Sequence, residues 1–358
     1  MASSLPSTMK AIKITEKNTA EIREVPLPKL RDDYMLVKVE AVALNPTDWK
    51  HIYKIGKGGE TVGVDLCGTI IEIGPKVTKP WTKNSRIATF VHGGNTSQHE
   101  DGAFAEYAMV KGDLGISPPD SMSSFEAATL GAGVITCGQA LYQSLGLPLP
   151  NDTSDKKESF AGTFVLIYGA STATGTLAIQ YANLSGARVI ATSSPQNFSL
   201  LKSLGAEEVF SYKDPECAAK IRQYTNDSLQ IVLDCISENN SPQICEESIS
   251  SAKGGAISYL LRAQHSREDV ENKHTLGYTV VGEAFEKMGH SFAAKPEDFE
   301  FSKKFCELTE GLLKEGKLVP HPQEKNLGGK GLEGVLHGVE ELRQGRVSGK
   351  KLVYAIGE

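Results

Sequence analysis

The fold is decided by the stretch from Tyr168 to Gln180, which is YGASTATGTLAIQ. The apolar run TFVLI precedes this stretch, and a helical pattern follows it. A strand that turns into a helix through glycines is typical of the first phosphate-binding turn of a dinucleotide-binding sheet. Gly169 and Gly175 are glycines here, and small or hydroxyl residues stand between them: Ser171, Thr172, Ala173 and Thr174.

These four positions predict contacts to a pyrophosphate. A helix N-terminus presents unpaired N–H groups and the positive end of its dipole, so it attracts phosphate. Hydroxyls add side-chain donors to such a turn, and small residues still let a phosphate approach. The stretch alone is equally compatible with an ordinary strand–helix turn, so the prediction depends on the rest of the chain.

From residue 163 onward, short apolar strands alternate with helical patterns. The strands after the first are RVIATS, EVFSY, IVLDCIS and AISYLL. This alternation predicts a parallel, doubly wound sheet and hence an α/β fold. Residues 9–145 instead show β-rich alternation, as in YMLVKVEAVALN, and residues 146–162 have the prolines and polar residues of an exposed linker.

We therefore predict three parts of the chain. Residues 9–150 form a β-rich domain, residues 151–290 form a cofactor-binding domain of the Rossmann type, and residues 291–358 form a C-terminal segment. Two helical patterns and a final strand, KLVYAI, occupy that segment, and we expect it to pack back on the N-terminal domain.

The end of the second strand favours NADPH as the cofactor. An NAD-preferring sheet carries an acidic residue there for the ribose 2′-hydroxyl. Here the strand RVIATS continues into Ser194, Pro195, Gln196 and Asn197, with no acid to repel a 2′-phosphate. Ser194 and Asn197 could donate to that phosphate, and Tyr212, after the third strand, could join them. The alternative is a polar loop in which Ser194 or Asn197 caps the next helix.

The composition is that of an ordinary globular enzyme, with 358 residues, 40% hydrophobic and 23% charged. A net charge of -6 disfavours a broad nucleic-acid surface, which needs clustered Lys and Arg. Six cysteines without Cys-x-x-Cys spacing indicate reduced thiols. The N-terminus, MASSLPSTMK, lacks the apolar core of a signal peptide, and no apolar run approaches the about 20 residues of a membrane span. We expect a cytoplasmic protein.

Several motifs together resemble the medium-chain dehydrogenase/reductase superfamily over nearly the whole chain. They are GVDLCGTIIEIGPKV, DGAFAEY, YGASTATGTLAIQYA, LLKSLGAEEVFSYKD and EGKLVPHP. Within the superfamily, NPTDWK, STAT, SPQNF, AEEVF, TLGYTVVGE and SGKKLV are most similar to fungal trans-acting enoyl reductases. Those enzymes serve highly reducing polyketide synthases and polyketide–peptide hybrid synthases. The resemblance implies that residues 9–150 are a GroES-like catalytic domain.

The zinc-dependent members of the superfamily provide a test for a metal. They use a cysteine and a Gly-His-Glu motif as catalytic ligands, and a lobe with four cysteines holds a structural zinc. The matching stretch here is Gly63-Val64-Asp65, and residues 90–115 contain no cysteine. His92 and His99 remain as a pair of loop histidines without Cys or Glu at ligand spacing. We therefore predict that the protein binds no metal.

The resemblance also implies roles for individual positions. Cofactor contacts on the nicotinamide side are implied for Thr47, Asp48, Trp49, Lys50 and His51, and further cofactor contacts for Tyr259, Leu260, Ser348 and Gly349. Substrate contacts are implied for Thr136, Cys137, Gly138 and Gln139, and, at a strand end, for Thr279, Val280, Val281, Gly282 and Glu283. Lys50 and Thr136 are the implied catalytic residues. Without the resemblance, Lys50 would be an ordinary surface lysine and Thr136 a buried helix threonine.

These roles predict a zinc-free, NADPH-dependent enoyl reductase. Hydride reaches the β-carbon of an α,β-unsaturated thioester, and fixed donors stabilise the charge that develops on the thioester oxygen. A lysine ammonium or a relayed water could supply the proton for the α-carbon. The expected partner is a polyketide synthase that carries the intermediate, with no nucleic acid or membrane involved, and we expect a monomer. The alternatives are a zinc-independent quinone oxidoreductase of the same fold and a non-catalytic NADPH-binding interaction protein.

Overall fold

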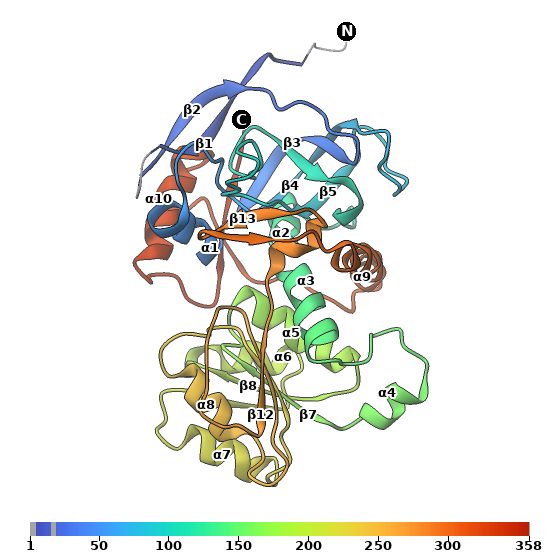
Figure 1. Ribbon diagram of the computed structural model, residues 1–358, viewed down its shortest axis with the longest axis vertical. Helices are drawn as coiled ribbons and strands as arrows, with labels where there is room; N and C mark the ends of the chain where they lie inside the picture. The colour runs from blue at the N-terminus through green and yellow to red at the C-terminus, as the bar shows by residue number, and fades with distance from the viewer. Residues whose placement is uncertain (1–4, 16–18, 358) are drawn as a thin grey trace. The chain divides into compact units, whose positions relative to one another are not determined.

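The computed structural model describes residues 5–15 and 19–357, which form two compact units (Figure 1). The first unit takes the described residues within the ranges 1–132, 278–316 and 320–358. The second unit takes residues 133–277 and 317–319. No helix in the described ranges is long and apolar enough to cross a membrane.

The second unit is built around a six-stranded parallel sheet. Its strand order is β12-β11-β10-β7-β8-β9, and every neighbouring pair is parallel. The order reverses between β10 and β8, on either side of β7, which is the arrangement of a doubly wound sheet. This confirms the α/β fold. The strands are β7 (Phe164–Tyr168), β8 (Arg188–Ser193), β9 (Glu208–Ser211), β10 (Ile231–Asp234), β11 (Gly255–Tyr259) and β12 (Val270–His274).

Helices connect these strands, as the alternating pattern predicts. They are α5 (Ala173–Leu184), α6 (Phe198–Ser203), α7 (Cys217–Tyr224) and α8 (Ser241–Ser248), with a 3₁₀ turn η4 (Pro195–Asn197) after β8. Apolar side chains of strands and helices form one core between them, including Leu166, Ile190, Val232 and Ile257. The most buried helix is α5, whose residues from Gly175 to Ala182 are all buried.

Two features of the second unit differ from the sequence prediction. The linker expected at residues 146–162 contains a short exposed helix, α4 (Asp155–Phe160), whose first turn carries Asp155 and Glu158. Acidic residues favour a helix start because they complement its dipole. The boundary also lies at residue 132, whereas the sequence placed it at 150, because residues 133–144 pack on α5. The Tyr142 hydroxyl, for example, donates to the Tyr181 carbonyl at 3.3 Å.

That packed stretch consists of two helices in direct succession. They are α3 (Gly131–Cys137) and a π-helix, η3 (Gly138–Ser144). A β-carbon at Gly133 would lie 2.7 Å from the Leu177 side chain, so α3 approaches α5 closely at this glycine. Close approach of this kind explains why a glycine stands at the position.

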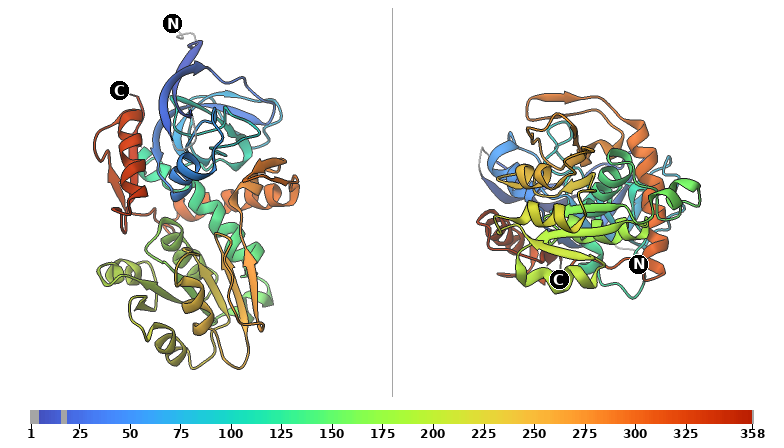
Figure 2. Two further views of the ribbon diagram at one scale, coloured as in Figure 1. Left: turned by 60° about the vertical axis from the view of Figure 1, so that its left-hand side comes forward. Right: turned by 90° about the horizontal axis from the view of Figure 1, so that it is seen from below.

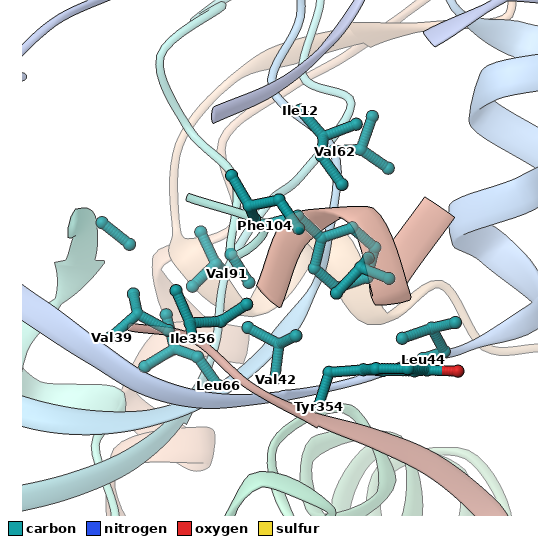
Figure 3. Packing of buried hydrophobic residues seen from close by; sticks show 14 of the residues in the cluster. Ile12, Val39, Val42, Leu44, Val62, Leu66, Val91, Phe104, Tyr354 and Ile356 are labelled. Atoms are coloured by element: carbon teal, nitrogen blue, oxygen red, sulfur yellow. The ribbon is translucent and has the colours of Figure 1, made fainter. Parts of the chain in front are cut away.

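The first unit is built around a mixed sheet with the order β15-β16-β3-β4-β5, in which β6 also pairs with β3. Its strands are β3 (Tyr34–Ala43), β4 (Asp65–Ile73), β5 (Arg86–Phe90), β6 (Tyr107–Lys111), β15 (Gln323–Lys325) and β16 (Lys351–Ala355). Two hairpin-like pairs accompany it: β1 (Thr8–Ile14) with β2 (Ala20–Pro26), and β13 (Phe285–Lys287) with β14 (His290–Phe292). The core contains Ile12, Val42, Leu66, Phe104 and Tyr354 (Figure 3).

The C-terminal segment completes this unit. Strand β16 pairs antiparallel with β3, so the last strand of the chain lies beside one of the first. Helices α9 (Pro296–Lys314) and α10 (Gly331–Arg343) lie on opposite sides of the unit (Figure 2). The remaining helical segments are short: α1 (Pro46–Lys50), η1 (His51–Ile55), η2 (Gly112–Leu114), α2 (Ser124–Ala128) and η5 (Gly277–Val281).

Candidate active site

The turn between β7 and α5 is shaped for a close ligand. Gly169 has a positive φ of 70°, and a β-carbon at Gly175 would lie 2.6 Å from the Ala170 backbone. Both positions therefore require glycine. The four residues predicted to contact a pyrophosphate, Ser171, Thr172, Ala173 and Thr174, are half-buried, and the helix becomes fully buried directly after them.

Thr172 has a defined role in this turn. It is the N-cap of α5, and its Oγ1 accepts a hydrogen bond of 3.0 Å from the Gly175 N–H. The hydroxyl thus orders the first turn of a helix whose other N-terminal N–H groups remain available to a ligand. A residue larger than glycine in the middle of the turn therefore helps to fix the turn's geometry.

The ends of β8 and β9 bring together the residues predicted for the 2′-phosphate. The two strands are parallel neighbours, with Ser193 opposite Ser211, so their carboxyl ends meet at one edge. The Ser194 and Tyr212 hydroxyls are 3.1 Å apart. Asn197 presents a buried side-chain Nδ2 that has no hydrogen-bond partner among the described residues. Since a buried amide donor is costly to leave unpaired, this atom suits a ligand oxygen.

The capping alternative for this loop is not supported. Neither the Ser194 side chain, at the start of η4, nor the Asn197 side chain, at the start of α6, makes a cap hydrogen bond. Pro195 and Gln196 are exposed in the same turn. The loop therefore offers hydroxyl and amide donors that no helix cap uses.

Two further predicted cofactor segments lie at strand ends. Tyr259 is the last residue of β11 and is fully buried, and its hydroxyl is 3.0 Å from the His265 Nδ1. The Leu260 N–H donates to the Ser237 Oγ at 2.9 Å. In the first unit, Ser348 is exposed and Gly349 has a positive φ of 65°, just before β16.

The two predicted catalytic residues each precede a π-helix. Lys50 ends α1 and is followed by η1, whereas Thr136 is the residue before Cys137, which ends α3 and is followed by η3. π-helical turns are rare and frequently occur at functional sites. Lys50 belongs to the first unit and Thr136 to the second.

Lys50 is not an ordinary surface lysine, and Thr136 is not a fully buried helix threonine. Lys50 is half-buried, with its Nζ 5.6 Å from the centre of the Trp49 ring. Thr136 is half-buried on a helix whose neighbours Val134, Ile135 and Cys137 are fully buried. The Cys137 Sγ donates a hydrogen bond to the Thr174 carbonyl oxygen at 3.4 Å. Burial holds the pKa of this thiol well above the usual range. Gly138 and Gln139, which follow in η3, are buried.

The segment from Thr279 to Glu283 differs from the sequence interpretation. It was expected at a strand end, but residues up to Val281 form the 3₁₀ helix η5. The Thr279 hydroxyl donates to Asp298 at 2.5 Å, and Val280 and Val281 are buried. Gly282 has a positive φ of 72°. The side chains of this segment thus make contacts within the first unit.

Glu283 also belongs to a structural network. Its Oε1 accepts hydrogen bonds of 2.7 Å from the Tyr34 hydroxyl and from the Lys111 ammonium group. Lys111 in turn contacts Asp33 at 2.6 Å. If Glu283 contacts the substrate as predicted, its carboxylate must do so while it accepts hydrogen bonds from Tyr34 and Lys111.

Asp65, at the position of the zinc-dependent motif, is paired with a lysine. The Lys351 Nζ lies 2.6 Å from the Asp65 Oδ2, and Asn45 contacts both groups, at 2.7 Å from the carboxylate and 2.8 Å from the ammonium group. The Ala132 N–H donates to the other carboxylate oxygen at 2.5 Å. Asp65 and Lys351 are buried. Among the residues that the structure describes, no three His, Cys, Asp or Glu side chains gather as metal ligands.

Two of the predicted nicotinamide-side residues point into the first unit. The Asp48 carboxylate is buried and accepts from the N–H of Asn45, the N-cap of α1, at 2.7 Å, and burial holds the pKa of Asp48 well above the usual range. The His51 ring is also buried, and its Nε2 lies 2.5 Å from the Lys287 Nζ. Thr47 is half-buried, and its hydroxyl is 2.6 Å from the Tyr278 hydroxyl. Sequence reasoning missed Tyr278 and Lys287, although Tyr278 lies inside the quoted motif TLGYTVVGE.

Comparison with known proteins agrees with this architecture. The alcohol dehydrogenase GroES-like domain matches residues 31–120, and the zinc-binding dehydrogenase family matches residues 173–260. Among solved structures, an alcohol dehydrogenase superfamily protein from Novosphingobium aromaticivorans has a TM-score of 0.78 at 20% identity, covering 98% of this chain and 100% of that one. At this identity the likeness shows the fold.

Curated relatives match almost the full chain. Trans-enoyl reductase ACTTS2 of Alternaria alternata is 46% identical over 351 residues, which are 98% of this chain and 99% of that protein. Trans-enoyl reductase resD of Aspergillus sclerotiorum is 43% identical over 347 residues, 94% of this chain and 97% of that protein. With the fold and the donor-lined turns described above, these identities show that the chain belongs to the trans-enoyl reductases of the medium-chain dehydrogenase/reductase superfamily.

Proposed function

We propose that the protein is an NADPH-dependent, trans-acting enoyl reductase that saturates an α,β-unsaturated thioester held on the carrier protein of a polyketide synthase. The observation that carries the proposal is the 46% identity to a trans-enoyl reductase over 98% of the chain. The structure is compatible with it, because the second unit has the parallel sheet of nicotinamide-dependent oxidoreductases. Bound NADPH supplies the hydride for the β-carbon.

The chain's own residues have three tasks in this proposal. The half-exposed turn from Ser171 to Thr174 binds the pyrophosphate at the N-terminus of α5. Ser194, Asn197 and Tyr212 bind the 2′-phosphate. Lys50 and Thr136 donate hydrogen bonds to the thioester oxygen, where negative charge develops as the β-carbon is reduced.

The reaction is tested by offering the enzyme three acceptors with NADPH. A crotonyl or 2-methylbutenoyl thioester is presented as a small thiol ester and on a carrier protein, and a simple quinone is assayed beside them. We expect a saturated thioester, formed faster on the carrier because tethering raises the effective substrate concentration. Rapid quinone reduction without saturated thioester would assign the protein to the quinone oxidoreductases instead. Tight NADPH binding without turnover of any acceptor would indicate a non-catalytic binding protein.

The donor set at the end of β8 predicts a preference for NADPH over NADH. Hydrogen bonds to a charged group are worth about 1.5–3 kcal/mol each. Because about 1.4 kcal/mol corresponds to a factor of ten, NADPH should bind at least about tenfold more tightly than NADH. Calorimetric titration of the parent protein with both nucleotides measures this ratio.

A hydroxyl deletion locates the origin of the preference. Tyr212→Phe should reduce the ratio, since it removes one donor and leaves the aromatic ring in place. Tyr224→Phe is the matched control, because Tyr224 is similarly exposed in the same unit and its hydroxyl contacts Glu207 instead. Equal dissociation constants for NADPH and NADH in the parent protein would contradict the prediction.

A further inference from the structure

Lys287 is a buried lysine without a carboxylate partner. It is the last residue of β13 and only 9% exposed. Its Nζ lies 2.5 Å from the His51 Nε2 and 3.8 Å from the centre of the Tyr278 ring. Within the described ranges no Asp or Glu forms an ion pair with it. A buried ammonium group normally has such a partner, so this arrangement calls for a functional explanation.

The hydrogen bonds of His51 determine where its proton lies. The Nδ1 is 2.7 Å from the Thr47 backbone carbonyl, which can only accept, so Nδ1 carries the hydrogen. Burial and the nearby Lys287 lower the pKa of His51 to about 3, so the ring is neutral near pH 7. Its Nε2 then has a lone pair, which accepts a hydrogen bond from the Lys287 ammonium group.

The other titratable groups of the cluster, His92 and Tyr278, do not change their protonation state near neutral pH. His92 is buried, with its ring centre 4.5 Å from that of Tyr278, and burial together with Lys287 and His51 lowers its pKa. Burial raises the pKa of the Tyr278 phenol, so it stays protonated. Burial also lowers the pKa of Lys287 to about 7. Lys287 is therefore the group of this cluster that gains and loses a proton near neutral pH.

Thr47 connects this cluster to the surface of its unit. Its hydroxyl lies 3.3 Å from the His51 Nδ1 and 2.6 Å from the Tyr278 hydroxyl. Thr47 is half-buried, whereas His51, Tyr278 and Lys287 are buried. Thr47 also begins the segment expected on the nicotinamide side, which ends with Lys50 and His51. A proton can pass from Lys287 to His51 and on to the Thr47 hydroxyl along these contacts.

We propose that Lys287 supplies, through His51 and the Thr47 hydroxyl, the proton that the α-carbon of the substrate receives. This inference rests on the proposed enoyl reductase function. Hydride addition to the β-carbon leaves the electron pair of the double bond on the α-carbon and the thioester oxygen. The Thr47 O–H bond then breaks as the new C–H bond forms at the α-carbon.

The remaining transfers return Thr47 to its hydroxyl form and convert His51 from its Nδ1–H to its Nε2–H tautomer, and this shift is reversed before the next turnover. The Thr47 oxygen takes the proton from the His51 Nδ1, and the His51 Nε2 takes a proton from the Lys287 ammonium group. Lys287 ends as a neutral amine and regains its proton from water. In this scheme Thr47 contacts the substrate, and His51 and Lys287 act through it as relay residues.

The first test measures the titration of Lys287 without substrate or cofactor. Lysine side chains are labelled with ¹⁵N, and the Lys287 signal is assigned as the one lost in Lys287→Met. We expect this signal to titrate near pH 7, well below the value of about 10.4 for an unperturbed lysine. A Lys287 signal that titrates near that unperturbed value would overturn the relay.

The second test compares Lys287→Met with Lys295→Met in thioester reduction. Methionine fills the space of a buried lysine without its charge, so the variant should fold. General acid catalysis contributes about 10²–10⁴-fold, so kcat should fall by about a hundredfold or more, with unchanged NADPH affinity. Lys295→Met should retain the parent rate. In the parent enzyme kcat should fall as pH rises through about 7, because the ammonium form is the acid, and Lys287→Met should lose this dependence.

Isotope effects separate a relay from a structural role. When proton transfer becomes slow, the solvent isotope effect should rise and the effect of deuterated NADPH should fall toward one. Unchanged isotope effects and pH profile in Lys287→Met, with normal thioester reduction by the parent enzyme, would overturn the relay alone. If the parent enzyme reduces no thioester on or off a carrier, the proposed function fails, and the relay fails with it whatever the titration of Lys287 shows.

Discussion

Replacing Lys50 by alanine, or Thr136 by valine, is expected to lower the rate of thioester reduction by about 10²–10³-fold each. Each change removes one donor to the oxygen on which charge develops, and removal of a single such donor has effects of about this size. Lys50 lies directly before a π-helix, and Thr136 lies within two residues of one. The measurement is kcat with the carrier-bound thioester and saturating NADPH.

Matched variants distinguish the donors from their surroundings. Lys54 also lies over the Trp49 ring, with its Nζ 5.0 Å from the ring centre, but it is exposed, so Lys54→Ala should retain the parent rate. Thr136→Ser keeps the hydroxyl and should retain most of the activity. Full activity in Lys50→Ala and Thr136→Val would contradict their assignment as donors to the thioester oxygen.

Replacing Lys351 by methionine is expected to destabilise the first unit by about 3–5 kcal/mol. The change leaves the Asp65 carboxylate buried without its ammonium partner, and removing one partner of a buried ion pair is strongly unfavourable. Urea denaturation followed by tryptophan fluorescence measures the effect. Both tryptophans, Trp49 and Trp81, belong to the first unit, so their signal reports the unfolding of that unit.

The neighbouring lysine provides the control for this substitution. Lys350 forms an exposed ion pair with Glu324, and exposed pairs contribute about 0–1 kcal/mol. Lys350→Met should therefore have little effect on the free energy of unfolding. Adding Asp65→Asn to Lys351→Met should recover part of the lost stability, because no unpaired charge then remains. A loss in Lys351→Met no larger than that in Lys350→Met would show that the buried pair is not a major source of stability.

The sequence predicts the parts of this protein that depend on local patterns. Alternating strands and helices after residue 163 are sufficient for the parallel sheet, since each βα unit is encoded in a contiguous stretch. The pairing of Ser194 with Tyr212 was also predictable, because residues that follow neighbouring parallel strands meet at one sheet edge. The turn from Gly169 to Gly175 could also be located from the sequence, because its backbone requires glycine at both ends.

The remaining features depend on contacts between distant segments. Lys351 and Asp65 are separated by 286 positions, and nothing near Lys351 in the sequence indicates that its ammonium group is buried while that of Lys350 is exposed. Lys287 has no local signal either, because its burial depends on how β13 packs near His51 and Tyr278. The helix η5 replaced an expected strand end because its apolar residues, Val280 and Val281, pack inside the unit.

The pairing of β16 with β3 has a consequence for how the chain acquires its structure during synthesis. The ladder joins Val353 to Ala43, so the sheet of the first unit lacks β16 until residues 351–355 have left the ribosome. The second unit is nearly contiguous, from residue 133 to 277, and can fold while the rest is still being made. Until then the edge of β3 at residues 41–43 lacks the partner that it has in the folded unit, and an unpaired strand edge is prone to pair with another chain.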